Sequence, residues 1–403
     1  MLVSKWKNND KWWVSSFNFK DEVTKQFEFQ ENIQIHDATL RDGEQTPGVV
    51  LRKHEKIETA KRLAQVGVQR IEAGMPAVSA EDRDAIAEIN KLDLNSKIFS
   101  FVRAKEEDLL MSKECGVEGV IIEVPIGKPK LEMQFKWEVD RVIHNSIAAI
   151  KKAKELGLYT VYFPYDTTRA DEADLEKVLD EIMKETPPDS IGLVDTMGSA
   201  LPATISYMTK LIKSLTGLPV EIHTHNDFGL ALANSLSALT SGASVVHTCV
   251  NGMGERTGNC SLEEVIVVLK ILYGLETNYD IEKAVELSEY LEKTTGYKMA
   301  LNKPVVGKGN FTRESGIGAD TLLNTPLAMF ALNPEFLGRS PKLVLGKKSG
   351  LASINVKLNE MGIVLDDEKK RFLLNDVKQA GQEMKRLVSD EEFLKLVSKY
   401  KKV

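Results

Sequence analysis

The stretch Gly119-Val-Ile-Ile-Glu-Val124 is apolar at almost every position. Strands of a sheet with one solvated face alternate apolar and polar residues, whereas parallel strands covered by helices on both faces read as nearly continuous apolar runs. The stretch therefore predicts a parallel strand inside an α/β fold.

Seven further strands of this kind are predicted before Asp280, and a segment of helical period follows each one. The eight predicted strands cover residues 33–37, 68–74, 97–102, 119–124, 159–164, 190–196, 219–225 and 244–250. In the first helical segment, Ile57, Ala60 and Leu63 lie on one apolar face. Eight unbroken strand–helix units favour a closed (β/α)8 TIM barrel over residues 33–280, with an open doubly wound sheet as the alternative.

The barrel is flanked by two regions of different character. Residues 1–32 are predicted to form an N-terminal arm, and residues 281–403 a small, mostly helical C-terminal region. Helical period covers residues 281–297 and 366–402. The segment of about 302–353 between them is rich in Gly, Pro and Asn, which predicts a mobile linker.

Composition narrows the class of protein. Of 403 residues, 42% are hydrophobic and 28% charged, which excludes a disordered chain. The net charge of −6 gives no basic field, so we expect neither nucleic acid nor a membrane as a partner. Cys115, Cys249 and Cys260 show no C-x-x-C spacing, and we find no signal peptide or long apolar run. We therefore expect a cytoplasmic protein.

Metal-ligand chemistry is concentrated on the seventh strand, in Glu221-Ile-His-Thr-His-Asn226. Side chains two residues apart on a strand share a face, so His223 and His225 project together and form a potential metal-ligand pair. The alternative is two buried, hydrogen-bonded histidines. Arg41 and Asp42 follow the first strand: the carboxylate suits a divalent cation, and the arginine suits a developing oxyanion. Their alternative is a surface salt bridge.

The same edge of the barrel collects other polar residues. In a TIM barrel the active site lies at the carboxyl ends of the strands. The polar residues that end or follow strands are Glu72, Arg103, Asp166, Asp195, Thr196, Asn251, Glu255 and Asn259. The glycine-rich segment 251–259 has the spacing G-x-G-x-x-x-G, which fits neither a dinucleotide fingerprint nor a P-loop. We expect it to present Glu255 and Asn259 to the metal. The remaining histidines, His36, His54, His144 and His247, are expected to be structural.

Five motifs together resemble the DRE-TIM metallolyase superfamily, and within it the isopropylmalate, homocitrate and citramalate synthase branch. The motifs are Asp37-Ala-Thr-Leu-Arg-Asp-Gly-Glu-Gln45, Ile71-Glu-Ala-Gly-Met-Pro76, Asp195-Thr-Met-Gly198, His223-Thr-His-Asn-Asp227 and Gly252-Met-Gly-Glu-Arg-Thr-Gly-Asn259. The resemblance covers roughly residues 33–275.

The resemblance implies a divalent cation (Mg, Mn or Zn) held by Asp42, His223 and His225, with Asn259 as a further ligand. It implies that Arg41 stabilises oxyanion charge and that Thr196 contacts the carboxylate of a 2-oxo acid. We also assign Glu72 to catalysis, and Gln45 and Arg103 to substrate binding. The implied reaction is attack of an acetyl-CoA enolate on the 2-oxo carbon followed by thioester hydrolysis. We also expect a homodimer.

Three positions depart from the pattern of these synthases. Tyr165 stands where they place a glutamate, Gly127 and Lys130 stand where they place a serine and a histidine, and Gly318 stands where they place a catalytic histidine. We expect Tyr165 or Asp166 to replace the lost carboxylate, which for a tyrosine needs cations that lower its pKa.

Positively charged residues near the pocket would affect which 2-oxo acid binds there. Lys128, Lys130 or Arg313 would suit a dicarboxylic 2-oxo acid if its side chain faced the pocket. The alternative is that all three are solvated surface side chains.

Three functions follow from these features. The leading interpretation is a metal-dependent Claisen-type condensation of an acyl-CoA, most simply acetyl-CoA, with a 2-oxo acid. The second is a lyase or aldolase that cleaves a related compound; hydroxymethylglutaryl-CoA lyases carry a cysteine in the loop after the eighth strand, whereas here Cys260 follows Asn259. The third is a non-catalytic protein that binds a metal and a ligand.

Overall fold

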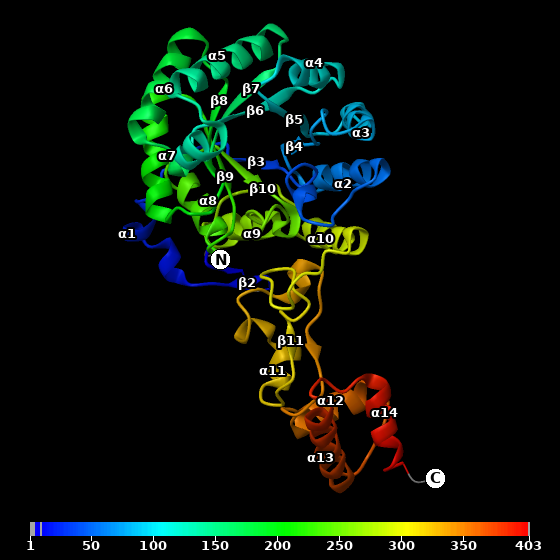
Figure 1. The fold of residues 1–403 in the computed structure, drawn as a ribbon. Helices are drawn as coiled ribbons and strands as arrows, with labels where there is room; N and C mark the ends of the chain where they lie inside the picture. Colours follow the sequence, from blue (N-terminus) through cyan, green and yellow to red (C-terminus); the bar gives the residue numbers. More distant parts are fainter. Residues whose placement is uncertain (1–4, 9, 402–403) are drawn as a thin grey trace. The chain divides into compact units, whose positions relative to one another are not determined.

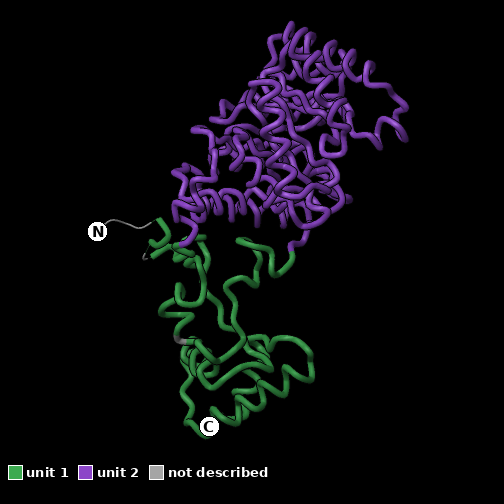
Figure 2. Tube along the Cα trace, turned by 90° about the vertical axis from the view of Figure 1, so that its left-hand side faces the viewer, with its two compact units in different colours: residues 1–16, 300–403 green, residues 17–299 purple. Residues whose placement is uncertain are grey.

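A computed structural model of the protein describes residues 5–8 and 10–401, which form two compact units (Figure 2). One unit comprises residues 17–299, and the other residues 1–16 and 300–403. The boundaries therefore differ from those expected, residues 1–32 and 281–403. Phe27 and Phe29 pack edge-on against Tyr273, and helix α10 (Ile281–Thr295) packs on α2 (Lys53–Val66). Both segments thus belong to the barrel unit.

The larger unit is a closed barrel of eight parallel strands, in the order β10-β3-β4-β5-β6-β7-β8-β9 (Figure 1). This confirms the predicted (β/α)8 fold. The strands are β3 Gln34–Asp37, β4 Arg70–Glu72, β5 Lys97–Arg103, β6 Gly119–Pro125, β7 Tyr159–Tyr165, β8 Ser190–Asp195, β9 Val220–Thr224 and β10 Val245–Thr248. Strand β10 pairs with both β9 and β3, so the barrel has no open edge.

A helix follows each strand and covers the outside of the barrel (Figure 1). In α2, Ala60, Leu63 and Val66 are fully buried, and Gly67 ends the helix at a positive φ of 95°. A short helix, α1 (Asp21–Thr24), precedes the barrel. The other helices are α3 Ala80–Asn90, α4 Glu106–Glu114, α5 Val139–Glu155, α6 Glu172–Glu185, α7 Pro202–Thr216, α8 Ala231–Leu239 and α9 Leu262–Ile271.

Aromatic side chains fill the inside of the barrel and form the floor beneath its mouth. The buried cluster there contains Phe99, Phe101, Ile121, Val161, Phe163 and Val194. Gly119 and Gly192 lie directly against the rings of Phe99 and Phe163, where a Cβ atom would overlap them. These two glycines therefore make room for aromatic rings inside a narrow barrel.

The smaller unit has its own helical core. Its strands are β1 Lys7–Asn8, β2 Trp12–Trp13, β11 Thr312–Arg313 and β12 Lys342–Leu343, and its helices are α11 Ala319–Asn324, α12 Leu351–Glu360, α13 Asp367–Met384 and α14 Asp390–Ser398. Helices α12, α13 and α14 bury Leu358, Leu373, Val377, Phe393 and Val397 between them.

Two expectations about the C-terminal region are wrong in detail. Residues 366–402 are not one helix: the chain turns at Lys385, with φ of 53°, and restarts at a capping box on Ser389. Residues 302–353 are not wholly irregular, because β11, α11 and β12 lie within them and Leu322 and Leu343 share a buried cluster. Among the described residues, no helix is long and apolar enough to cross a membrane.

Candidate metal and active site

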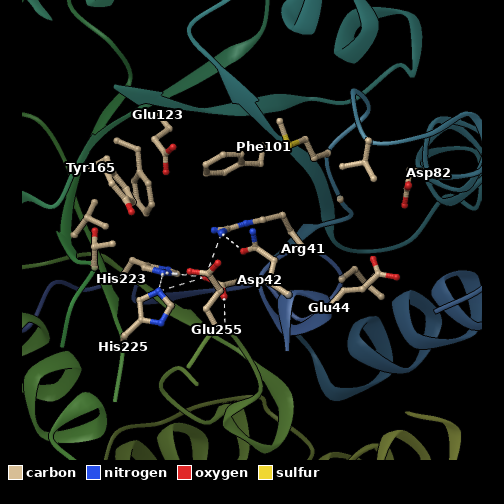
Figure 3. A pocket seen from close by; sticks show the side chains of 18 of the residues that line it. Arg41, Asp42, Glu44, Asp82, Phe101, Glu123, Tyr165, His223, His225 and Glu255 are labelled. Carbon is tan, nitrogen blue, oxygen red and sulfur yellow. Dashed lines mark hydrogen bonds and ion pairs between the residues drawn. The ribbon is translucent and has the colours of Figure 1, made fainter. Parts of the chain in front are cut away.

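A cavity of about 510 Å³ opens at the carboxyl ends of the barrel strands. Its polar lining includes residues of the loop after β3, of β6 and β7, of the ends of β8 and β9, and of the loop after β10 (Figure 3). Arg41, Asp42, Gln45, Tyr165 and Thr196, all predicted site residues, line it together with His223 and His225.

Three potential metal-ligand atoms converge on one side of this cavity. Asp42 Oδ2 lies 3.3 Å from His223 Nε2 and 3.6 Å from His225 Nε2, and the two ring nitrogens are 3.4 Å apart (Figure 3). His223 lies on β9 and His225 one residue beyond it. Two imidazole nitrogens and one carboxylate oxygen at such spacings can share a single divalent cation.

The protonation states of the three side chains suit a cation. Burial disfavours the charged form of Asp42, but Arg41 and the two imidazoles outweigh it and hold the pKa of this carboxyl well below its usual range. Burial also lowers the pKa of His223 and takes the pKa of His225 to about 4. At neutral pH the cluster thus offers an ionised carboxylate and two neutral imidazoles, the forms that bind metals.

Asn259 supplies a fourth oxygen beside this cluster. Its backbone is bridged to that of His225, and its Nδ2 donates to the carbonyl of Met253 at 3.1 Å. Its Oδ1 is buried and accepts no hydrogen bond from the described residues. A Cβ atom at Gly254 would overlap the Asn259 amide and lie 2.9 Å from Asp42 Oδ1. Gly254 thus leaves room for the Asn259 amide, and the unsatisfied oxygen fits the role of a further cation ligand.

Arg41 is held rigidly next to the cluster. Its Nε donates to Glu72 Oε1 at 2.6 Å, its Nη1 donates to Asp42 Oδ2 at 3.1 Å, and its guanidinium lies 4.4 Å from the centre of the Phe101 ring. Its Nη1 also lies 3.5 Å from Gln45 Oε1. A fixed cation of this kind can stabilise an oxyanion without reorganising.

Glu72, predicted from the sequence to be catalytic, is buried and does not line the cavity. Burial opposes its ionisation, but Arg41 and His36 together lower the pKa of Glu72 to about 2. The carboxylate therefore stays charged and orients Arg41, which makes Glu72 a positioning residue.

Arg103 and Asp166 also lie away from the cavity lining. The half-exposed Arg103 pairs with Asp108 at 2.8 Å. Asp166 adopts a positive φ of 65°, its buried carboxylate pairs with Arg169 at 2.6 Å, and it fills the space beside Gly127 that a Cβ atom would need. Internal ion pairs thus turn both side chains away from the mouth.

Tyr165 lines the cavity, but its hydroxyl is a poor proton acceptor. Burial, followed by the nearby Glu123, Asp166 and Glu255, raises the pKa of Tyr165 to about 12. The lowered pKa that Tyr165 would need in order to replace a carboxylate is therefore not found. Thr196 also lines the cavity, and its Oγ1 accepts a hydrogen bond from the backbone N–H of Asp166 at 2.8 Å.

The expected cationic residues lie outside the lining. Lys130 Nζ donates to Gln134 at 3.1 Å and lies 5.1 Å from the centre of the Tyr165 ring. Lys128 is half-exposed and 4.0 Å from Asp174. Arg313 belongs to the smaller unit, where its Nε donates to the carbonyl of Ile317.

A second cluster of metal-ligand side chains lies deeper inside the barrel, with Glu221 at its centre. Glu221 accepts hydrogen bonds from Arg70 at 2.7 Å and Ser190 at 2.7 Å, and pairs with His247 at 2.9 Å. His36 stacks on His247 with ring centres 4.3 Å apart. Arg70 and Ser190 both donate to Glu221 Oε1, and His247 lies 2.9 Å from Oε2, so each oxygen of this carboxylate has a partner within a buried polar network.

The sequence reasoning missed Glu123, which lines the cavity on β6 (Figure 3). Its predicted strand was interpreted as a continuous apolar run. A signal was present, because Glu123 is two residues from Ile121 and so shares its inward face. A charged residue at an inward position near the end of a barrel strand indicates a functional site.

An eight-stranded barrel with metal-ligand side chains at its mouth defines the class of protein: an α/β barrel with a candidate metal-dependent active site. Comparison with known proteins narrows the class. The profile of the HMGL-like family matches residues 32–291, and that of the homocitrate synthase post-HMGL domain matches residues 305–385. The chain belongs to the HMGL-like family of the DRE-TIM superfamily, and resembles its synthase branch.

Named relatives cover most of the chain. It is 36% identical to homocitrate synthase AksA of Methanothermobacter thermautotrophicus, over 96% of this chain and 97% of that one. It is 39% identical to (R)-citramalate synthase CimA of Methanocaldococcus jannaschii, over 91% and 74%. It is 35% identical to 2-isopropylmalate synthase 2 of Caldanaerobacter subterraneus subsp. tengcongensis, over 92% and 96%. These relatives are synthases of the acyltransferase type.

Solved structures support the fold. The HMG-CoA lyase of Bacillus subtilis is similar with a TM-score of 0.62 and 18% identity, over 70% of this chain and 99% of that one. At this level of identity the likeness concerns the barrel and carries no information about the reaction.

Proposed function

We propose that the protein condenses the acetyl group of acetyl-CoA with a 2-oxo acid, in the manner of the homocitrate, citramalate and isopropylmalate synthases. The observation that carries the proposal is the convergence of Asp42, His223 and His225 beside the fixed guanidinium of Arg41, in one cavity at the barrel mouth. The named synthases among its relatives support the same reaction.

Each side chain has a role in this proposal. Asp42, His223 and His225, with Asn259, would hold a divalent cation, which as a Lewis acid polarises the carbonyl of the 2-oxo acid when bound. Arg41 offsets the negative charge that develops on the carbonyl oxygen. Thr196 and Gln45 line the cavity and offer hydrogen bonds to the substrate carboxylate.

The cavity lining favours a 2-oxo acid whose side chain carries no charge. Within the described residues, the cations of the lining are Arg41 and Lys56, and both are already paired, Arg41 with Glu72 and Lys56 with Glu44 at 2.6 Å. Apolar side chains, including Val49, Met75 and Phe101, cover much of the remaining wall. A second substrate carboxylate would lack a free partner there.

Release of CoA thiol from acetyl-CoA, measured with a panel of mono- and dicarboxylic 2-oxo acids, tests the proposal. We expect release with at least one acid, strongest for an apolar side chain, and lost on chelation of divalent cations. Silence with every acid in the presence of Mg²⁺, Mn²⁺ and Zn²⁺ would remove the proposal and favour the non-catalytic alternative.

The lyase alternative gains no support from the loop after β10. Cys260 is buried and follows the loop, and its backbone carbonyl accepts from Cys249. A homodimer and a cytoplasmic location are also part of the proposal. The three cysteines are buried and none forms a disulfide within the described residues, as suits a reducing compartment. Sedimentation analysis would test the dimer.

A further inference from the structure

Glu123 is an inward-facing carboxylate on the wall opposite Arg41 and Asp42. It lies on β6, opposite Phe163 of β7 in the strand pairing, and it shares its face of the strand with the buried Ile121. Its carboxyl group points into the cavity, next to Tyr165 (Figure 3). It is therefore positioned to touch a molecule bound between the two walls.

The carboxylate of Glu123 differs from the other acidic groups of the lining. Each of those is paired with a cation: Asp42 with Arg41, Glu44 and Asp82 with Lys56, and Glu255 with Arg256. No hydrogen bond or ion pair joins the side chain of Glu123 to any of the residues that the structure describes. An unpaired carboxylate is costly inside a cavity, so its retention indicates a function rather than a structural role.

The surroundings of Glu123 favour proton exchange near neutral pH. Burial is the largest effect and, with Asp42 and Glu72, it outweighs Arg41 and Lys130, which raises the pKa of Glu123 to about 7. The charged and titratable groups that face Glu123 are Arg41, Asp42, Glu72, Lys130 and Tyr165. A general base is most effective when both of its forms are populated at the working pH.

Glu123 also compensates for a departure from the resembling synthases. Tyr165 occupies the position of their glutamate, and its hydroxyl holds its proton to about pH 12. Strands β6 and β7 are neighbours in the barrel, and Glu123 pairs with the residue two positions before Tyr165. The carboxylate of Glu123 thus lies in the same wall as Tyr165, on the adjacent strand and two residues deeper along the barrel.

We propose that Glu123 is the catalytic residue that removes a proton from the methyl group of the acetyl thioester. This inference rests on the proposed function. A carboxylate oxygen of Glu123 forms an O–H bond as the methyl C–H bond breaks, the C–H electron pair becomes the C=C bond of the enolate, and the thioester carbonyl pair moves onto oxygen.

The second half of the step returns the proton. The enolate carbon attacks the carbonyl carbon of the 2-oxo acid, whose carbonyl electron pair moves onto its oxygen. The pair on the enolate oxygen re-forms the thioester carbonyl, and the proton held by Glu123 passes to the alkoxide, so the residue ends as a carboxylate. Hydrolysis of the thioester afterwards consumes one water and releases the CoA thiol.

The test replaces Glu123 with its uncharged isostere. For Glu123→Gln, kcat of thiol release should fall at least about 100-fold, because a general base contributes at least that factor. KM for the 2-oxo acid and the affinity for Mn²⁺ should stay near the wild-type values. In the wild type kcat should fall as pH drops below about 7, and this limb should be missing from the variant. Glu118→Gln, an exposed glutamate just before β6, is the matched control.

A double variant separates a chemical role from a structural one. Adding Tyr165→Glu to Glu123→Gln restores a carboxylate to the same wall, and we expect it to recover part of kcat. Wild-type kcat in Glu123→Gln would overturn the inference and leave the proposed function standing. A loss of kcat that comes with lost Mn²⁺ binding, and that the double variant does not recover, would mean a structural role and would also overturn it. Failure of the wild type to release thiol would remove the proposed function, and the inference with it.

Discussion

Two walls of the barrel mouth differ in how their charged side chains are paired. The loop after β3 and the end of β9 carry side chains that pair with one another. On the opposite wall, the side chain of Glu123 on β6 has no partner among the described residues. On the first side, Asp42 is flanked by Arg41, His223 and His225 within 3.6 Å. On the second, Glu123 faces the cavity next to the neutral Tyr165.

The two walls would serve different parts of the proposed reaction: one would bind the cation, and the other would accept the proton. A cation site needs several ligands at fixed spacings, so substitution of any one of them removes it. A proton acceptor needs a single carboxylate within reach of the substrate, and two neighbouring strands of a barrel offer more than one position for it. The metal side keeps the motifs that resemble those of the synthases, and the departure at Tyr165 lies on the opposite wall.

The largest effect is expected on the metal side. Asp42→Asn removes the negative charge and one ligand, so activity should fall at least about 1000-fold, equivalent to about 4 kcal/mol. Mn²⁺ titration of the metal-free protein should show binding to the wild type and none to the variant. His144→Ala, an exposed histidine on α5, is the control. If Asp42→Asn bound Mn²⁺ and kept the wild-type rate, Asp42 would not be a metal ligand and the proposed difference between the two walls would be wrong.

A smaller loss is expected when Arg41 loses its support. Glu72→Gln weakens the contact with Arg41 Nε, and a misplaced oxyanion partner costs about 100-fold in kcat. Because Glu72 does not line the cavity, KM for both substrates should change little, and Mn²⁺ should still bind. Glu72→Asp should retain more activity than Glu72→Gln. A change in KM alone would show that Glu72 contacts the substrate after all.

Glu123 on the opposite wall should make the free energy of unfolding depend on pH. Since folding raises the pKa of Glu123 from 4.5 to about 7, the folded protein binds this proton more tightly than the unfolded chain. The free energy of unfolding of the wild type thus falls as pH rises from about 4.5 to 7.

In Glu123→Gln the free energy of unfolding should not fall with pH for this reason, because the amide does not titrate. Relative to the wild type the variant should gain about 2 kcal/mol in free energy of unfolding between pH 4.5 and 8, after discounting the full shift for partial exposure. Denaturant unfolding at the two pH values measures the gain. An equal difference between wild type and variant at both pH values would contradict the raised pKa.

The smallest effect is expected for Lys130, which lies outside the lining of the cavity. Lys130→Ala should leave the ratio of kcat/KM between mono- and dicarboxylic 2-oxo acids within about fivefold, the range of a partly exposed charge. A screen of both classes of acid measures the ratio. A larger fall for the dicarboxylic acids would assign Lys130 to substrate binding and revise the proposed substrate class.

Features that depend on local spacing were predictable from the sequence. The β/α alternation predicted all eight barrel strands, and the two-residue period of His223 and His225 placed their side chains together. Both features follow from the geometry of the strand itself. The same geometry placed Asp42 at the mouth, since it follows the first strand of the barrel.

Features that depend on partners from distant strands were not predictable. Glu72 at the end of β4 is one example, because its carboxylate is engaged by Arg41 from the loop after β3 and does not line the cavity. Glu123 shares a face of its strand with Ile121, but the sequence alone does not show that this face is the inward one. Its importance appears only when the closed barrel shows which face is inward.

The most direct test of the account follows the acetyl carbons. Metal-free protein is incubated with acetyl-CoA labelled in both acetyl carbons and with the 2-oxo acid that gives the fastest thiol release, and the products are analysed by mass spectrometry with and without added Mn²⁺ or Mg²⁺. We predict a hydroxy acid that contains both labelled carbons and forms only when the cation is present. Label found only in acetyl-CoA or free acetate, with the cation present, would contradict the account.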